Sequence, residues 1–204
     1  MIDRFAPVLF ILGILIAGFG GLMLLPLSIA WLTADGAQSA YDEAVVITVC
    51  TGVLLALSMR RRQREMRVRE SFLLVALIWS LLPAFGALPL YLHISGLSWT
   101  DAYFEAVSGL TATGATVLSG LDDLPLSINF WRTFMHWVGG LGVVVLAVAI
   151  LPLLGFGGRS MFKAETPGPM KDSKITPRIA ETAKGLWVVY VLLTVTCAVA
   201  LNQA

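Results

Sequence analysis

One short segment has residue types and spacing that could bind a cation. Six small or hydroxylated residues follow one another at 111–116, and they include a single glycine, Gly114. Such residues have poor helix propensity, and glycine is free to adopt positive φ. An extended backbone of this kind presents a row of carbonyl oxygens, which can replace the hydration shell of a potassium-like ion. A polar extracellular loop is the alternative, since Thr and Gly are also common in loops.

The residues just before this segment predict a short helix. Ser98 and Asp101 resemble a capping box, and apolar residues recur from Trp99 to Leu110. A helix of about a dozen residues is roughly 18 Å long, too short to cross a bilayer. We therefore predict a helix over 99–110 that enters the membrane from outside and points its negative C-terminal end at the segment.

The overall composition excludes most other classes of protein. Of the 204 residues 57% are hydrophobic and only 13% are charged, against about 25% charged in soluble domains. This argues against an ordinary soluble domain, a disordered chain and a nucleic-acid-binding protein. No metal-ligand spacing, nucleophile motif or phosphate loop is present, so we expect no enzyme and no cofactor.

Long uncharged stretches predict an all-α polytopic membrane protein. They cover 5–34, 44–59, 71–100, 133–158 and 185–204, and about 20 apolar residues suffice to cross a bilayer. Six basic residues lie in 60–70 and six more in 156–185. The segments 34–43 and 94–130 instead contain acidic residues and no Lys or Arg. The positive-inside rule therefore places the N-terminus in the cytoplasm and the segment at 111–116 toward the outer face.

Several polar residues have both a functional and a structural interpretation. The acids of 94–130 could attract cations to a pore mouth or could be caps and loop charges. We expect His136 to be a hydrogen-bonded packing residue, and we expect Arg132 to mark the membrane interface rather than to pair with Glu105, Asp122 or Asp123. For Gly139, Gly140 and Gly142, close helix packing is favoured over a hinge.

Several stretches of the sequence resemble those of a known family. The helix at 99–110, the run TATGATV at 111–117 and NFWRTFMHWVGGLGVVVLAVAILP at 129–152 resemble the membrane subunit of Trk-type potassium uptake systems. The stretch AETPGPMKDSKITPRIAETAKGLWVVY at 164–190 is similar to the TrkH/TrkG branch of the Trk/Ktr/HKT superfamily. This resemblance extends from about residue 71 to the end of the chain.

The resemblance implies four repeats of a helix M1, a pore loop and a helix M2 around one potassium pathway. The first repeat would occupy 61–158, with M1 at 71–93 and M2 at 131–155, preceded by a two-helix hairpin at 1–60 and followed by a linker and the first helix of a second repeat at 159–204. The potassium-binding carbonyls carry over to Thr111, Ala112, Thr113 and Gly114. The chain would then supply the first quarter of a selectivity filter.

The resemblance also implies partners and a location. They are potassium, membrane lipids, a cytoplasmic nucleotide-binding regulatory subunit and a second copy of the full-length protein, in a bacterial cytoplasmic membrane. We expect the Pro-rich, basic linker at 166–179 to be extended rather than helical. It could contact either the regulatory subunit or anionic lipid.

One repeat alone cannot enclose a fourfold pore. We therefore interpret the chain as a fragment of a longer potassium transporter. A non-conducting membrane scaffold or a degenerate fragment is the alternative, and a homotetramer of single repeats is the least favoured arrangement.

Overall fold

The computed structural model describes residues 2–62, 67–150 and 175–203, and every regular element in these ranges is a helix. The chain divides into two compact units, Met1–Gly139 and Gly140–Ala204. The all-α membrane fold expected from the sequence is confirmed. Among the described residues, four stretches are long and apolar enough to cross a membrane: Phe5–Thr33, Gln38–Arg62, Arg69–His93 and Lys184–Gln203.

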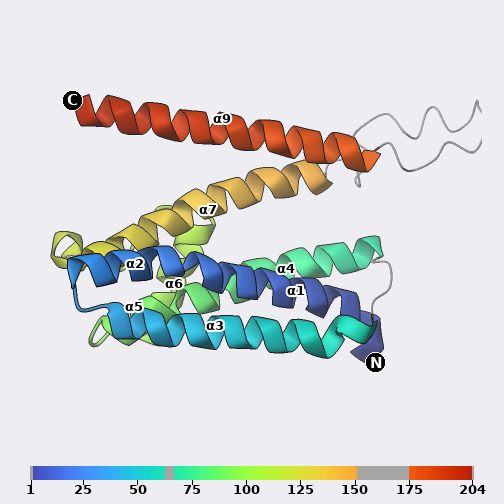
Figure 1. Ribbon diagram of the computed structural model, residues 1–204, viewed down its shortest axis with the longest axis horizontal. Coiled ribbons are helices and arrows are strands. Elements are labelled where there is room, and N and C mark those ends of the chain that lie inside the picture. The colour runs from blue at the N-terminus through green and yellow to red at the C-terminus, as the bar shows by residue number, and fades with distance from the viewer. Residues whose placement is uncertain (1, 63–66, 151–174, 204) are drawn as a thin grey trace, which may run out of the picture. The chain divides into compact units, whose positions relative to one another are not determined.

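The first expected span is two helices rather than one. Helix α1 covers Ile2–Leu22 and α2 covers Leu24–Thr33, with the interruption at Met23. Pro26 supplies the reason, because it has no N–H to donate to the carbonyl of Leu22 and its ring would clash there. Helix α3, Gln38–Met59, runs back alongside α1 and ends in the short 3-10 turn η1, Arg60–Arg62 (Figure 1).

Two glycines let α1 and α3 come into backbone contact. A Cβ on Gly13 would lie 2.6 Å from the backbone N of Ala56, and one on Gly52 would lie 2.8 Å from the Cα of Ala17. Neither position has room for a side chain. The pair of helices is therefore held by close backbone packing of the kind that membrane helices favour.

The M1 segment is also interrupted. Helix α4 covers Val68–Gly86 and passes through Pro83, whereas α5 covers Leu88–His93. The break at Ala87 comes two residues before Pro89, which cannot donate to the carbonyl of Phe85. The carbonyl of Gly86 instead accepts a hydrogen bond from the indole Nε1 of Trp131 at 2.9 Å.

The three remaining major helices differ from their expected bounds only at their ends. Helix α6 covers Trp99–Leu110, as expected for the pore helix, and η2 covers Leu121–Asp123. Helix α7 covers Leu126–Ile150, so M2 begins five residues earlier than the expected 131, and its expected end at 155 lies outside the described residues.

Helix α9 covers Ile175–Gln203 and corrects the expectation for the linker at 166–179. Residues 175–179 are helical, not extended, while 166–174 lie outside the described residues. Pro177 is compatible with helix because it lies in the first turn, where backbone N–H groups have no intrahelical acceptor.

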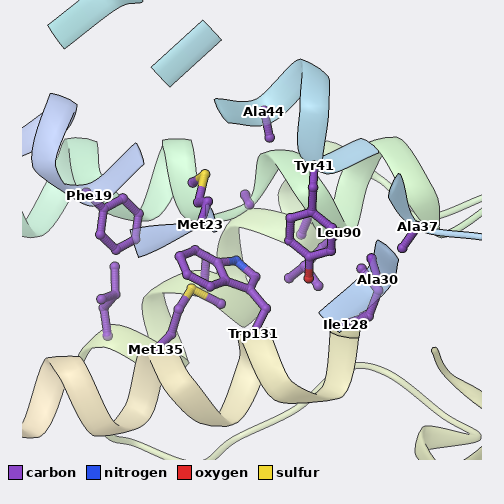
Figure 2. Packing of buried hydrophobic residues seen from close by; sticks show 14 residues of the cluster. Phe19, Met23, Ala30, Ala37, Tyr41, Ala44, Leu90, Ile128, Trp131 and Met135 are labelled. Carbon is purple, nitrogen blue, oxygen red and sulfur yellow. The ribbon is translucent and has the colours of Figure 1, made fainter. Parts of the chain in front are cut away.

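The core of the first unit is built around α7. Figure 2 shows Trp131 and Met135 pointing from α7 toward Phe19 and Met23 of the N-terminal helices. The rings of Phe19 and Trp131 lie 5.4 Å apart between centroids. The two leading helices and the pore-loop repeat therefore share one hydrophobic core.

Polar contacts join the same parts at the outer end. The hydroxyl of Tyr41 donates to the carbonyl of Ser127 at 2.9 Å, and the carboxylate of Asp35 accepts from the backbone N of Ser127 at 2.9 Å and of Ala37 at 3.1 Å. Burial alone would raise the pKa of Asp35, but the hydrogen bonds from Ser127 and Ala37 outweigh it, so the pKa lies below its ordinary value.

Candidate functional site: the segment after the pore helix

The start of α6 is capped as the sequence predicts. The Ser98 hydroxyl accepts a hydrogen bond from the backbone N of Asp101 at 3.1 Å and lies 2.7 Å from the Asp101 carboxylate. This cap fixes the first turn of the helix and places Asp101 near its positive end.

The end of α6 is held tightly against α7 by two glycines. A Cβ on Gly109 would lie 3.1 Å from the Cβ of Met135, and a Cβ on Gly139 would lie 2.8 Å from the Cα of Leu110. The expectation of close packing is confirmed at Gly139, because even a methyl group would collide with the last residue of the pore helix. It is not confirmed at Gly142, where no described atom lies within 4 Å of an added Cβ.

The chain leaves the helix through two residues with left-handed backbone. The backbone N of Ala112 donates to the carbonyl of Gly109 and that of Thr113 to Ser108, both at 2.9 Å. Ala112 has a φ of 54° and Gly114 a φ of 77°. Gly114 adopts this conformation without strain, whereas it is unfavourable for Ala112.

The four predicted site residues lie together in this turn and are exposed on the chain. None of the residues that the structure describes donates a hydrogen bond to the backbone carbonyls of Thr111, Ala112, Thr113 or Gly114. The Thr111 hydroxyl bonds back to the carbonyl of Val107 at 2.8 Å and lies 2.7 Å from the Thr113 hydroxyl. Side chains thus bond locally and leave backbone carbonyls available for an external partner.

The segment after Gly114 is held to the pore helix by Ser108, which the sequence analysis did not single out, and by Glu105, which it considered only as an outer acid or a partner of Arg132. The Ser108 hydroxyl donates to the carbonyl of Ala115 at 2.6 Å, and the Glu105 carboxylate accepts from the Thr116 hydroxyl at 3.0 Å and from the backbone N of Val117 at 3.2 Å. Ser108 and Glu105 are three residues apart, which places them on one face of a helix. That spacing is the signal in the sequence that could have indicated a shared role.

Arg132 corrects one expectation outright. Instead of marking the membrane interface, its guanidinium forms an ion pair with the buried carboxylate of Glu105, and the Arg132 side chain is itself only 12% exposed. Glu105 is therefore not an exposed acid of a pore mouth, while Asp122 and Asp123 are exposed. A low-dielectric surrounding makes an unpaired charge costly, which favours pairing over interfacial exposure.

His136 behaves as a packing residue, as expected. Its Nδ1 lies 2.8 Å from the carbonyl of Arg132 within the same helix. Among the described residues no group of three or more His, Cys, Asp or Glu side chains could hold a metal ion.

Comparisons with known proteins give the family of the chain. A family model described as "TrkH: Cation transport protein" matches residues 37–203. A Trk system potassium uptake protein TrkH from Halomonas elongata is 54% identical over 198 residues, covering 97% of this chain and 41% of the relative. A Trk system potassium uptake protein TrkG from Escherichia coli is 38% identical over 183 residues, covering 89% of this chain and 38% of the relative.

A solved structure gives the same result for the fold. The crystal structure of the potassium transporter TrkH from Vibrio parahaemolyticus superposes with a TM-score of 0.81 at 42% identity, covering 98% of this chain and 39% of that one. The chain thus spans about two fifths of the length of the relatives it matches. With the family model matching most of its residues, the chain belongs to the TrkH family of cation transport proteins.

Proposed function

We propose that the full-length protein containing this chain takes up potassium ions, and that Thr111, Ala112, Thr113 and Gly114 provide one quarter of its selectivity filter. The observation that carries the proposal is that the four residues after the short helix α6 are exposed and that their backbone carbonyls accept no hydrogen bond from the described residues. Carbonyl oxygens in such a row can take the place of the water molecules around K⁺. Relatives that are named potassium uptake proteins support the same ion.

The orientation of α6 adds to the attraction for a cation. The negative end of a helix dipole lies at its C-terminus, and Leu110, the last residue of α6, directly precedes the four carbonyls. No carboxylate is needed at the site itself. A cation bound there would be stabilised by dipoles alone, which permits release as well as binding.

The rest of the pathway would come from parts of the protein beyond this chain. We assign the first repeat to 61–158, the leading helix pair to 1–60, and the linker with the first helix of a second repeat to 159–204. In this arrangement the N-terminus is cytoplasmic and the protein lies in the bacterial cytoplasmic membrane. A nucleotide-binding regulatory subunit on the cytoplasmic side and a second copy of the full-length protein complete the assembly.

Substitution of Gly114 tests the proposal. Gly114→Val in the full-length protein should abolish Rb⁺ and K⁺ uptake, because a β-branched residue at a φ of 77° forces the carbonyls out of line. Gly36→Val is the matched control. Gly36 also has a positive φ, of 86°, and open space around its Cα, but it lies in the turn between α2 and α3.

Uptake should be measured in cells that lack other potassium transporters, with the amount of protein in the membrane fraction determined for each variant. Loss of uptake in Gly114→Val at unchanged membrane abundance, with uptake retained in Gly36→Val, is the expected result. Normal uptake in Gly114→Val would refute the filter assignment. Absence of uptake by the unsubstituted full-length protein would favour the non-conducting scaffold.

A further inference from the structure

Residues 115–118 directly follow the predicted filter, and we call them the filter limb. An ion pair between Glu105 on α6 and Arg132 on α7 forms hydrogen bonds with this limb. The Glu105 carboxylate on α6 accepts hydrogen bonds from Arg132 Nε on α7 at 2.8 Å and from Arg132 Nη2. The same carboxylate accepts from the backbone N of Val117 at 3.2 Å. Three segments that are distant in sequence thus meet at one carboxylate.

Thr116 connects the ion pair to the filter limb through its side-chain hydroxyl. Its hydroxyl donates to the Glu105 carboxylate, with both oxygens at 3.0 Å, and accepts from Arg132 Nη2 at 3.3 Å and from the backbone N of Leu118 at 3.1 Å. A hydroxyl has one hydrogen to donate and two lone pairs. All three are used, so the Thr116 side chain has one well-defined orientation.

Burial shows that the Glu105 carboxylate is not itself a ligand for the transported ion. The side chain of Glu105 is 2% exposed and that of Arg132 12% exposed, and the two charges cancel. Its hydrogen bonds come from Arg132, Thr116 and Val117.

A second hydrogen bond holds the filter limb at Ala115, the first residue after the four carbonyls that accept no hydrogen bond. Ser108, one turn after Glu105 on α6, donates to the carbonyl of Ala115 at 2.6 Å. The carbonyl of Ala115 is thereby occupied, while those from Thr111 to Gly114 accept no hydrogen bond from the described residues. The hydrogen bonds at Ala115 and at Thr116 hold the backbone directly after the last predicted potassium ligand.

We propose that Glu105 and Arg132, joined to the filter limb through Thr116, are positioning residues that set how strongly the filter discriminates K⁺ from Na⁺. The inference rests on the proposed function. Na⁺ is smaller than K⁺, so carbonyls can coordinate it well only if the backbone relaxes inward. When the filter limb is held by its hydrogen bonds to Glu105 and Arg132, the backbone resists that relaxation. When these hydrogen bonds are lost, the backbone can relax.

Thr116→Val is the sharpest test, because valine has nearly the shape of threonine and removes only the hydroxyl. The probe is Rb⁺ uptake by the full-length protein. Selectivity is the Na⁺ concentration that halves uptake divided by the K⁺ concentration that halves it. We expect Thr116→Val to lower this ratio about fivefold and to raise the apparent KM for K⁺ more than it lowers the maximal rate, since the lost hydrogen bonds involve charged partners. Thr116→Ser, which keeps the hydroxyl, should restore the ratio to within about twofold of the original.

Glu105→Gln and Arg132→Gln test the pair itself. Each should lower the ratio by at least as much as Thr116→Val, because each leaves one buried charge without its partner. The control is Asp122→Asn, which removes one negative charge from an exposed position in the same outer connection. Should Glu105→Gln fail to reach the membrane, the Thr116 variants still decide the question.

Two results would overturn the proposal. One is an unchanged ratio in Thr116→Val at normal membrane abundance, which would make the network purely structural. The other is an equal fall of the ratio in Asp122→Asn, which would assign the effect to general charge. Either result can occur while the unsubstituted protein transports K⁺ and Gly114→Val does not, so failure of this inference is distinguishable from failure of the proposed function.

Discussion

At the scale of single residues, the candidate site depends on backbone conformation more than on side-chain chemistry. Ala112 illustrates this, since it adopts a φ of 54° that only glycine adopts easily. The conformation is retained because the backbone N–H groups of Ala112 and Thr113 are both bonded to the last turn of α6. Strain at this residue is offset by those bonds.

A pair of alanine substitutions separates conformation from size. Ala112→Val should reduce Rb⁺ uptake by the full-length protein at least tenfold, because any Cβ at positive φ costs roughly 1–2 kcal/mol and a β-branched side chain is disfavoured there further still. Ala115→Val adds the same two methyl groups to an equally exposed residue of the same segment that lies outside the left-handed region. It should retain most of the uptake. Equal loss in both variants, with membrane abundance matched, would show that added volume matters and that the backbone conformation does not.

Residue types also explain which parts of the site could be predicted. The run of small residues with Gly114 indicated the exposed turn that we propose as the filter, and Ser98 with Asp101 indicated the helix start, because both signals are local. The pairing of Glu105 with Arg132 joins residues 27 apart, and nothing local distinguishes it from interfacial charges. The positive φ of Ala112 was equally unpredictable, since its cause is the hydrogen bonding of the helix end.

At the scale of elements, the hydrophobic pattern predicted where helices run but not where they break. The interruptions at Met23 and Ala87 precede Pro26 and Pro89, and prolines in membrane helices are common enough that they do not by themselves specify a break. The early start of α9 has the converse explanation, because Pro177 is tolerated in a first turn. The expected bounds of the pore helix, 99–110, are confirmed since a cap and an adjacent glycine-threonine run fix both ends.

The packing of α1 against α3 predicts that alanine changes the free energy of unfolding in opposite directions at two glycines. Gly52→Ala should lower the free energy of unfolding by about 1–3 kcal/mol, because the added Cβ would lie 2.8 Å from the Cα of Ala17. Gly21→Ala should raise it by up to about 1 kcal/mol, since Gly21 has open space around it and alanine is the better helix former. Thermal unfolding of the detergent-solubilised full-length protein measures both. A stability left unchanged by Gly52→Ala would contradict the close approach at Gly52, and destabilisation by Gly21→Ala would contradict the open space at Gly21.

At the scale of the whole molecule, charge distribution predicts a transmembrane orientation. Arg60, Arg61 and Arg62 end the second span, and Asp35 lies in the turn that precedes it. The connection between α6 and α7 contributes Asp122 and Asp123 on the same side as Asp35. Because basic residues near short loops are retained on the cytoplasmic side, the filter segment should be reached from outside the cell.

Cysteine labelling tests that orientation directly. The two native cysteines, Cys50 and Cys197, lie within apolar helices and would first be replaced by alanine. In that background, Ser119→Cys should react with a membrane-impermeant maleimide applied to intact cells, because Ser119 is exposed and lies outside the helices after the filter. Arg61→Cys, at the opposite end of the spans, should react only after the membrane is opened. The reverse labelling pattern would invert the topology and place the proposed filter segment at the cytoplasmic end of the pathway. Labelling of both residues in intact cells would mean that the helices between them do not separate two compartments.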